Sequence, residues 1–125
     1  MPNSADFIAY VLELMRPTAR ASSRSMFGGH GLYVDETIVA IVVGDCVYFK
    51  TDDANRAEFV ELGLEPFVYT GRAGTKTVTG YRRAPEEALE NPTAMAHWLR
   101  SAMGAALRSA KVRPARAVPR SKARS

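Results

Sequence analysis

The chain has 125 residues, of which 46% are hydrophobic and 24% charged, and this fits one globular domain with a single core. A single cysteine, Cys46, excludes a disulfide within the chain, and no stretch approaches the 18 apolar residues that a membrane-spanning helix needs. We therefore expect a cytoplasmic protein with no membrane association.

The formal charge of +4 is unevenly distributed along the chain. Residues 1–107 carry ten basic and 13 acidic side chains, whereas the last 18 residues carry seven basic side chains and no acidic one. Those seven are Arg108, Lys111, Arg113, Arg116, Arg120, Lys122 and Arg124. Because nucleic-acid affinity depends mainly on neutralising phosphates, the acidic body is not expected to bind a duplex, while the tail can contact nucleic acid without sequence preference.

The N-terminal segment predicts a helix. Asn3 or Ser4 can cap it, and apolar residues then recur at helical spacing. Since Pro17 disfavours the α conformation in the residue before it, the helix should end between Leu14 and Arg16, with a polar connection through Ser25. The apolar face consists of Phe7, Ile8, Val11, Leu12 and Met15.

Residues 26–50 have the pattern of strands. Asp35-Glu36 and Gly44-Asp45 are turn signals, and the β-branched run between them is typical of a buried central strand. Two-residue connections join antiparallel neighbours, so we expect a four-strand meander. The first of these strands should end at Met26-Phe27. The other three are expected at Leu32–Val34, Thr37–Val43 and Cys46–Lys50.

The second half begins with a helix expected from a cap at Thr51 or Asp52 to about Leu62, followed by Gly63 in a left-handed stop position. Asp52 and Asp53 would then lie favourably at the positive end of the helix dipole. Two further strands, Pro66–Tyr69 and Thr75–Tyr81, should follow as a hairpin.

A long final helix is predicted after a helical turn at Pro85–Leu89, because Asn91 can cap it and Pro92 suits its first position. Its expected buried stripe is Met95, Trp98, Leu99, Ala102, Met103, Ala106 and Leu107. We therefore expect an α+β two-layer sandwich with about six antiparallel strands over residues 1–111, and a disordered basic tail over residues 112–125.

Three glycines within four positions form the most distinctive stretch of the chain. A reversal there predicts a positive φ at Gly28, Gly29 or Gly31. No Lys-Ser/Thr pair follows, so it is not a phosphate loop. With the exposed sheet face, this turn is the candidate contact surface, and its residues are Gly28, Gly29, His30, Gly31 and Tyr33.

Candidate catalytic and metal-binding residues are few. His30, Cys46 and His97 have no spacing typical of a metal site, so we expect no metal, no cofactor and no catalytic residue. We interpret His30 as an exposed turn residue, His97 as a surface residue and Cys46 as an inert buried thiol. Most aromatic residues of the strands should be in the core, with one or two tyrosines on the open face.

Five stretches occur together in a specific order: Met26-Phe27-Gly28-Gly29-x-Gly31-Leu32-Tyr33, Val47-Tyr48-Phe49-Lys50-Thr51-Asp52, Arg56-Ala57-x-Phe59, Gly63-Leu64-x-Pro66-Phe67 and Tyr81-x-x-Ala84-Pro85-Glu86. In this combination the chain resembles the TfoX N-terminal domain family over about Ala5 to Leu107. The resemblance implies a two-layer α/β sandwich and an association with bacterial competence regulators, which act as co-activators beside the cyclic-AMP receptor protein. It supplies no catalytic residue.

The leading hypothesis is a non-enzymatic interaction or regulatory module. The sequence does not identify its protein partner, for which the transcription machinery or a regulator is the candidate. One alternative is a nucleic-acid-associated protein acting through its tail. Another is a small-ligand-binding domain or an enzyme, which a pocket lined by His30 and tyrosines would favour over a flat apolar patch.

Overall fold

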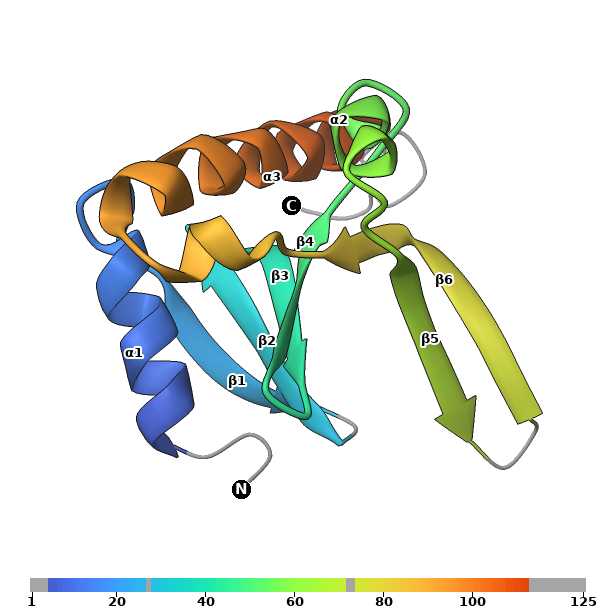
Figure 1. The fold of residues 1–125 in the computed structure, drawn as a ribbon, viewed down its shortest axis with the longest axis horizontal. Helices are drawn as coiled ribbons and strands as arrows, with labels where there is room; N and C mark the ends of the chain where they lie inside the picture. Colours follow the sequence, from blue (N-terminus) through green and yellow to red (C-terminus); the bar gives the residue numbers. More distant parts are fainter. Residues whose placement is uncertain (1–4, 27, 72–73, 113–125) are drawn as a thin grey trace, which may run out of the picture.

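A six-stranded antiparallel sheet forms one layer of the molecule, and helices cover one of its faces (Figure 1). The computed structural model describes residues 5–26, 28–71 and 74–112. The elements in chain order are α1 (Ala5–Met15), β1 (Ser22–Met26), β2 (Gly29–Val34), β3 (Thr37–Val43), β4 (Cys46–Lys50), α2 (Arg56–Glu61), β5 (Pro66–Gly71), β6 (Gly74–Arg83), the short 3₁₀ helix η1 (Glu86–Leu89) and α3 (Pro92–Val112). The expected α+β class and six-stranded sheet are confirmed.

The strand order is β1-β2-β3-β4-β6-β5. The second strand of the hairpin, β6, therefore pairs with β4 and extends the meander, and β5 forms the edge of the sheet. The register places Ala40 opposite Phe49 and Val42 opposite Val47, and all four side chains face the helices. Ile41 lies opposite Tyr48 on the other face. Because strand side chains alternate, each strand contributes to both faces of the sheet.

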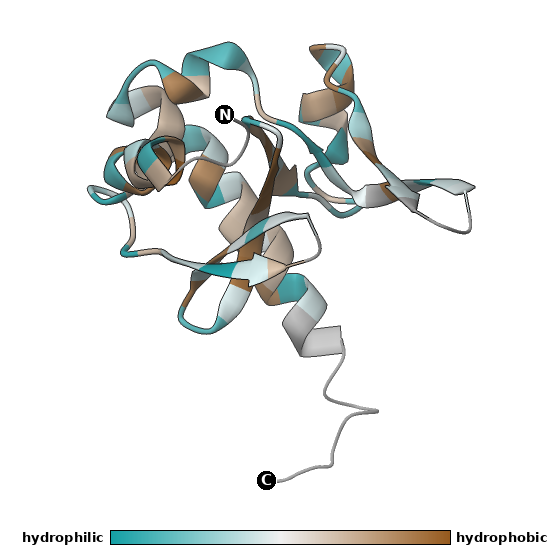
Figure 2. Ribbon diagram, turned by 90° about the horizontal axis from the view of Figure 1, so that it is seen from below, coloured by the Kyte–Doolittle hydropathy of each residue, from teal (hydrophilic) through white to brown (hydrophobic). Residues whose placement is uncertain are grey.

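The core lies between the sheet and the helices, and the hydrophobic segments gather in the middle of the molecule (Figure 2). Helix α3 contributes Met95, Leu99 and Ala102, each with 0% of its surface exposed. Trp98 is 3% exposed, packs edge-to-face on Phe59 at 5.0 Å between ring centroids, and donates its Nε1–H to Glu87. The predicted stripe is therefore correct except at Leu107, which is 58% exposed, whereas Ala105, which was not predicted, is buried.

Two expectations about element boundaries are wrong. Ser22–Met26 form strand β1 instead of a polar connection, because an edge strand obtains its backbone hydrogen bonds from one neighbour and needs little apolar surface. Helix α2 begins at Arg56, since the Asp52 carboxylate accepts the N–H groups of Ala54 and Asn55 and holds a turn before the helix. Asp52 and Asp53 therefore lie outside its first turn.

Helix ends with strong local signals are as predicted. Gly63 has a φ of 72°, and the Gly63 and Leu64 N–H groups bond to the carbonyls of Val60 and Phe59, which is a Schellman motif. At the start of α3, the Asn91 side chain accepts the N–H of Ala94 at 2.8 Å. The disordered tail was expected over residues 112–125; Val112 is instead the last residue of α3, and residues 113–125 lie outside the described residues.

Trp98 offers a test of the core. Trp98→Ala is expected to lower the free energy of unfolding by about 3–5 kcal/mol, because it removes a buried aromatic ring. Trp98→Phe keeps most of the packing and loses the bond to Glu87, at a cost nearer 1 kcal/mol. Urea denaturation measures both changes. The chain has one tryptophan, so an emission maximum typical of exposed indole in the folded protein would contradict this assignment.

The glycine-rich stretch uses its glycines in different ways. Gly28 has a φ of 74°, which confirms the predicted positive φ. At Gly29 an added Cβ would overlap the backbone carbonyl oxygen of Val42 and lie 2.9 Å from Val43 Cγ2. Gly28 is thus required by conformation and Gly29 by close packing of β2 on β3.

Alanine substitutions can separate these two requirements. Gly28→Ala is expected to cost about 1 kcal/mol of stability through its backbone conformation. Gly29→Ala should cost more, because backbone cannot move aside as a flexible side chain can. Gly80→Ala is the control, since its Cβ would meet no atom within 4 Å. Equal urea midpoints for the Gly29 and Gly80 variants would show that the close approach costs nothing.

Candidate functional site

The face of the sheet turned away from the helices, here called the open face, carries aromatic side chains from four strands. Tyr33 lies on β2, Tyr48 on β4, Phe67 and Tyr69 on β5, and Tyr81 on β6. Tyr69 is 39% exposed, whereas Phe67 is buried. The open face therefore has an apolar floor and a partly exposed aromatic surface.

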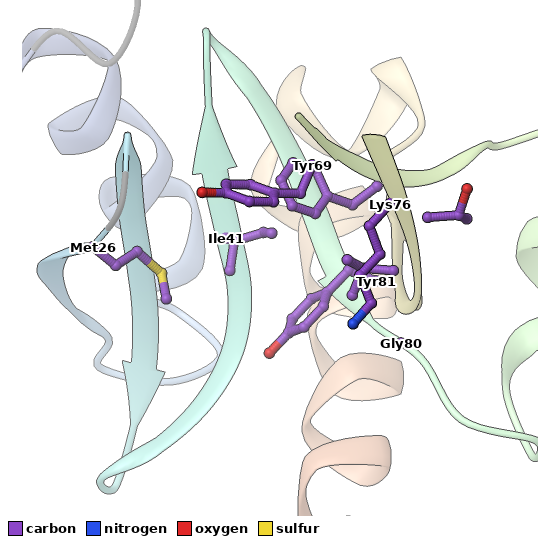
Figure 3. Close-up of a pocket in the computed structure, with 9 residues that line it drawn as sticks. Met26, Ile41, Tyr69, Lys76, Gly80 and Tyr81 are labelled. Carbon is purple, nitrogen blue, oxygen red and sulfur yellow. The ribbon is translucent and has the colours of Figure 1, made fainter. Parts of the chain in front are cut away.

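A hollow of about 630 Å³ lies on the open face between the β5–β6 hairpin and β1 (Figure 3). Tyr69 and Tyr81 extend into it from the hairpin, while Ile41 forms part of its floor and Met26 approaches from β1. Its lining residues are Met26, Ile41, Phe67, Tyr69, Lys76, Thr77, Val78, Gly80 and Tyr81. This volume is within the range of about 300–1,000 Å³ that holds small-molecule ligands.

An irregularity in the β5–β6 pairing shapes the hollow. Pro66 pairs with Arg82, but the next residue, Phe67, pairs with Val78, so three residues of β6 have no partner in β5. Extra residues in one strand bend and twist a sheet. The hairpin accordingly projects from the rest of the sheet (Figure 1) and turns the open face into a concave surface.

Basic groups lie beside the aromatic rings of the open face. The Arg24 guanidinium carbon is 4.5 Å from the centroid of the Tyr33 ring, and Lys50 Nζ is 5.1 Å from that of Tyr81. Arg24 also pairs with Glu36 at 2.7 Å. These are cation–π distances, so the cations and the ring faces occupy the same surface.

Tyr48 lies deeper in the same surface. Its ring packs edge-to-face on Phe67, with centroids 5.0 Å apart. Burial raises the pKa of the Tyr48 hydroxyl, with the Cys46 side chain as the next cause. Tyr48 is therefore a neutral phenol at pH 7 and adds no charge to the face.

The five residues predicted as a contact surface do not form one site. Tyr33 lies on the open face, and Gly31 gives it room, since a Cβ on Gly31 would lie 2.9 Å from Tyr33 Cε1. His30 is half-buried within β2, where it pairs with Val42, so its assignment as an exposed turn residue is wrong. The strand expected from the sequence was Leu32–Val34, whereas β2 begins at Gly29 and so includes His30. Gly28 and Gly29 serve the turn and the β2–β3 packing described above.

The residues that line the hollow were missed as a group. The expectation that most strand aromatics are in the core, with one or two tyrosines on the open face, is wrong: among the described strands only Phe49 faces the helices, and the other five lie on the open face. Alternation along a strand separates two faces but does not say which of them the helices cover. That Met26 approaches Tyr69 and Tyr81 from β1 depends on the hairpin's bend. The one sequence signal for this bend is Gly80, because a glycine inside a strand often marks a bulge, and Gly80 is among the residues of β6 that have no partner in β5.

The remaining candidates for chemistry are dispersed. His97 is exposed and its Nε2 contacts the carboxylate of Glu58, as suits a surface residue. Cys46 is half-buried beside Tyr48 instead of fully buried. Among the described residues, no group of three or more His, Cys, Asp or Glu side chains could hold a metal ion.

Arg108, counted with the basic tail, belongs to the folded body. It lies in α3 and makes a bidentate ion pair with Asp52, with Nε–Oδ2 and Nη2–Oδ1 distances of 2.5 and 2.9 Å. Lys111 lies in the last turn of the same helix. The other five tail residues, Arg113, Arg116, Arg120, Lys122 and Arg124, lie outside the described residues.

Comparison with protein families agrees with these features. The TfoX N-terminal domain model matches residues 13–106, which is three quarters of the chain and contains all six strands. The chain belongs to the TfoX N-terminal domain family. No curated protein sequence matches it. Among the described helices of this TfoX N-terminal domain, none is both long and apolar enough to cross a membrane.

The Asp52–Arg108 pair gives a pH-dependent prediction. Arg108 lowers the pKa of Asp52, with help from the N–H groups of Asn55 and Ala54. A carboxyl whose pKa is lower in the folded state stabilises the protein at pH values above its pKa in the unfolded state, which is about 3.9. This stabilisation is lost as the pH falls through the pKa of the folded state. Asp52→Asn keeps the Oδ1 acceptor and removes the charge.

Wild type should therefore be more stable than the Asp52→Asn variant at pH 7, and the difference should shrink as the pH falls below about 4. Thermal melting across this range measures it. Asp53→Asn is the control, because the Asp53 side chain is 96% exposed and its pair with Arg56 contributes little. A difference that stays constant down to pH 3 would contradict the role of the charge.

Proposed function

We propose that this TfoX N-terminal domain is a non-enzymatic interaction module that binds its partner on the open face of the sheet. The partner acts in the regulation of transcription, which is the role that the family resemblance implies. The observation that carries the proposal is the hollow between Met26 and Tyr69, an apolar and aromatic recess on the face that the helices leave uncovered.

The composition of the hollow favours binding. Its floor is apolar, with Ile41 and Phe67 buried, and its rim carries Tyr69, which is partly exposed. Aromatic residues and methionine are enriched at interfaces, because they contribute a large contact area and their rings carry few rotatable bonds. The tyrosines suit a small ligand as well, but His30, the residue expected to accompany them in an enzyme or ligand pocket, is not part of the lining.

The test is site-specific photo-crosslinking in the native cell. Tyr69 is replaced by benzoylphenylalanine, and Tyr10 is the matched control, since both are partly exposed tyrosines, at 39% and 46%, and Tyr10 lies on α1. A discrete adduct is expected at position 69 and not at position 10. A second substitution, Tyr81→Ser, should remove that adduct by altering the hollow.

Sensitivity of the adduct to protease or nuclease shows the class of the partner. Equal crosslinking from positions 69 and 10, or an adduct that is unchanged by Tyr81→Ser in a folded protein, would overturn the proposal that the open face is the contact surface.

A further inference from the structure

The strands of the sheet differ from the rest of the domain in the sign of their charged residues. None of the six strands contains an aspartate or a glutamate, although residues 1–107 carry 13 acidic side chains. The acidic residues lie in the helices, the turns and the connections. The strands instead contain five basic residues, Arg24, Lys50, Lys76, Arg82 and Arg83.

Four of these basic residues lie on the open face. Arg24 and Lys50 approach tyrosine rings, Lys76 lines the hollow, and Arg83 lies opposite Tyr48 in the β4–β6 pairing. Arg82 has the opposite orientation and donates to the Leu64 carbonyl at 2.8 Å. Acidic groups lie at the margin of this face, among them Glu36, which is paired to Arg24, and Glu65, which precedes β5. The open face is therefore basic on a body whose net charge is negative.

We propose that the open face binds single-stranded nucleic acid, with bases against its tyrosines and phosphates against its basic residues. The proposal rests on the proposed function, because it names the partner of the same face. Unpaired bases stack on aromatic side chains irrespective of their sequence. Basic side chains beside the aromatic ones then contact the phosphates of the nucleic-acid backbone. Each of Tyr33, Tyr69 and Tyr81 lies beside or opposite one basic residue, which is Arg24, Lys76 and Lys50 respectively, so both components are present on one sheet.

The shape of the face favours a single strand over a duplex. Bases inside a duplex are stacked on one another and cannot enter the hollow to stack on Tyr69 and Tyr81, which extend into it. A volume of about 630 Å³ has the size of a small-ligand site and thus suits one or two splayed-out bases. The negative charge of the body also opposes a duplex, whose affinity would depend on phosphate contacts alone.

The test measures fluorescence anisotropy with the full chain and labelled oligonucleotides of about 12 nucleotides, single-stranded DNA, single-stranded RNA and duplex. A second form of the full chain has glutamine in place of the five basic residues beyond Val112, which removes the charge of the tail. Both forms are expected to prefer either single strand to the duplex. Binding that disappears when the tail is neutralised, or equal affinity for the duplex, would overturn the proposal.

Substitutions then locate the binding surface. Tyr69→Ser should weaken single-strand binding by roughly 5-fold or more, as expected for the loss of one stacking platform. Tyr10→Ser, on α1, should leave it unchanged. Lys76→Gln should reduce the slope of log affinity against log salt by about 0.7, and Arg100→Gln on the exposed side of α3 should not change that slope. Thermal melting checks that each variant is folded.

Equal effects of the face variants and their controls would overturn the proposal, as would tighter binding of an acidic peptide than of either single strand. These results would leave the interaction module intact if the crosslink from position 69 is still observed. Absence of that crosslink together with loss of binding would reject both proposals.

Discussion

The structure depends on the burial of one face of the sheet beneath α3. Phe49, Leu99 and Met95 are completely buried there, and Trp98 joins α3 to α2 through Phe59 and to η1 through Glu87. A fully buried side chain of this size contributes about 1.5–3 kcal/mol relative to an exposed one. Since strand side chains alternate, fixing this face also fixes which side chains are presented on the other. The open face is therefore determined by the core.

Features determined by residues close together in the sequence, such as helix ends and tight turns, were predicted correctly. Gly63 ends α2 and Asn91 begins α3 because the groups they satisfy lie within three or four residues along the chain. The meander from β2 to β4 followed from two short turns and a β-branched strand. In each case the atoms that determine the conformation are close in sequence, so the residue types indicate the structure directly.

The features that the sequence did not predict involve distant residues. Arg108 and Asp52 are 56 positions apart, and nothing in the local pattern of either segment indicates their pairing. The helix start expected at Asp52 was wrong for a related reason, since that carboxylate is used by a turn and by Arg108. The hollow depends on the shift of register after Pro66, which a reading of β5 and β6 as a regular hairpin does not contain.

A sheet with one uncovered face must keep that face soluble while its strands remain apolar enough to bury the other. This domain achieves it with tyrosines and long basic side chains, whose apolar parts lie on the sheet while hydroxyl, ammonium or guanidinium groups reach water. Acidic side chains would serve solubility equally well, yet the strands contain none. Solubility alone therefore explains polar groups on this face but not their single sign. The anionic partner that we propose would account for both, and also for the cations at the rings of Tyr33 and Tyr81.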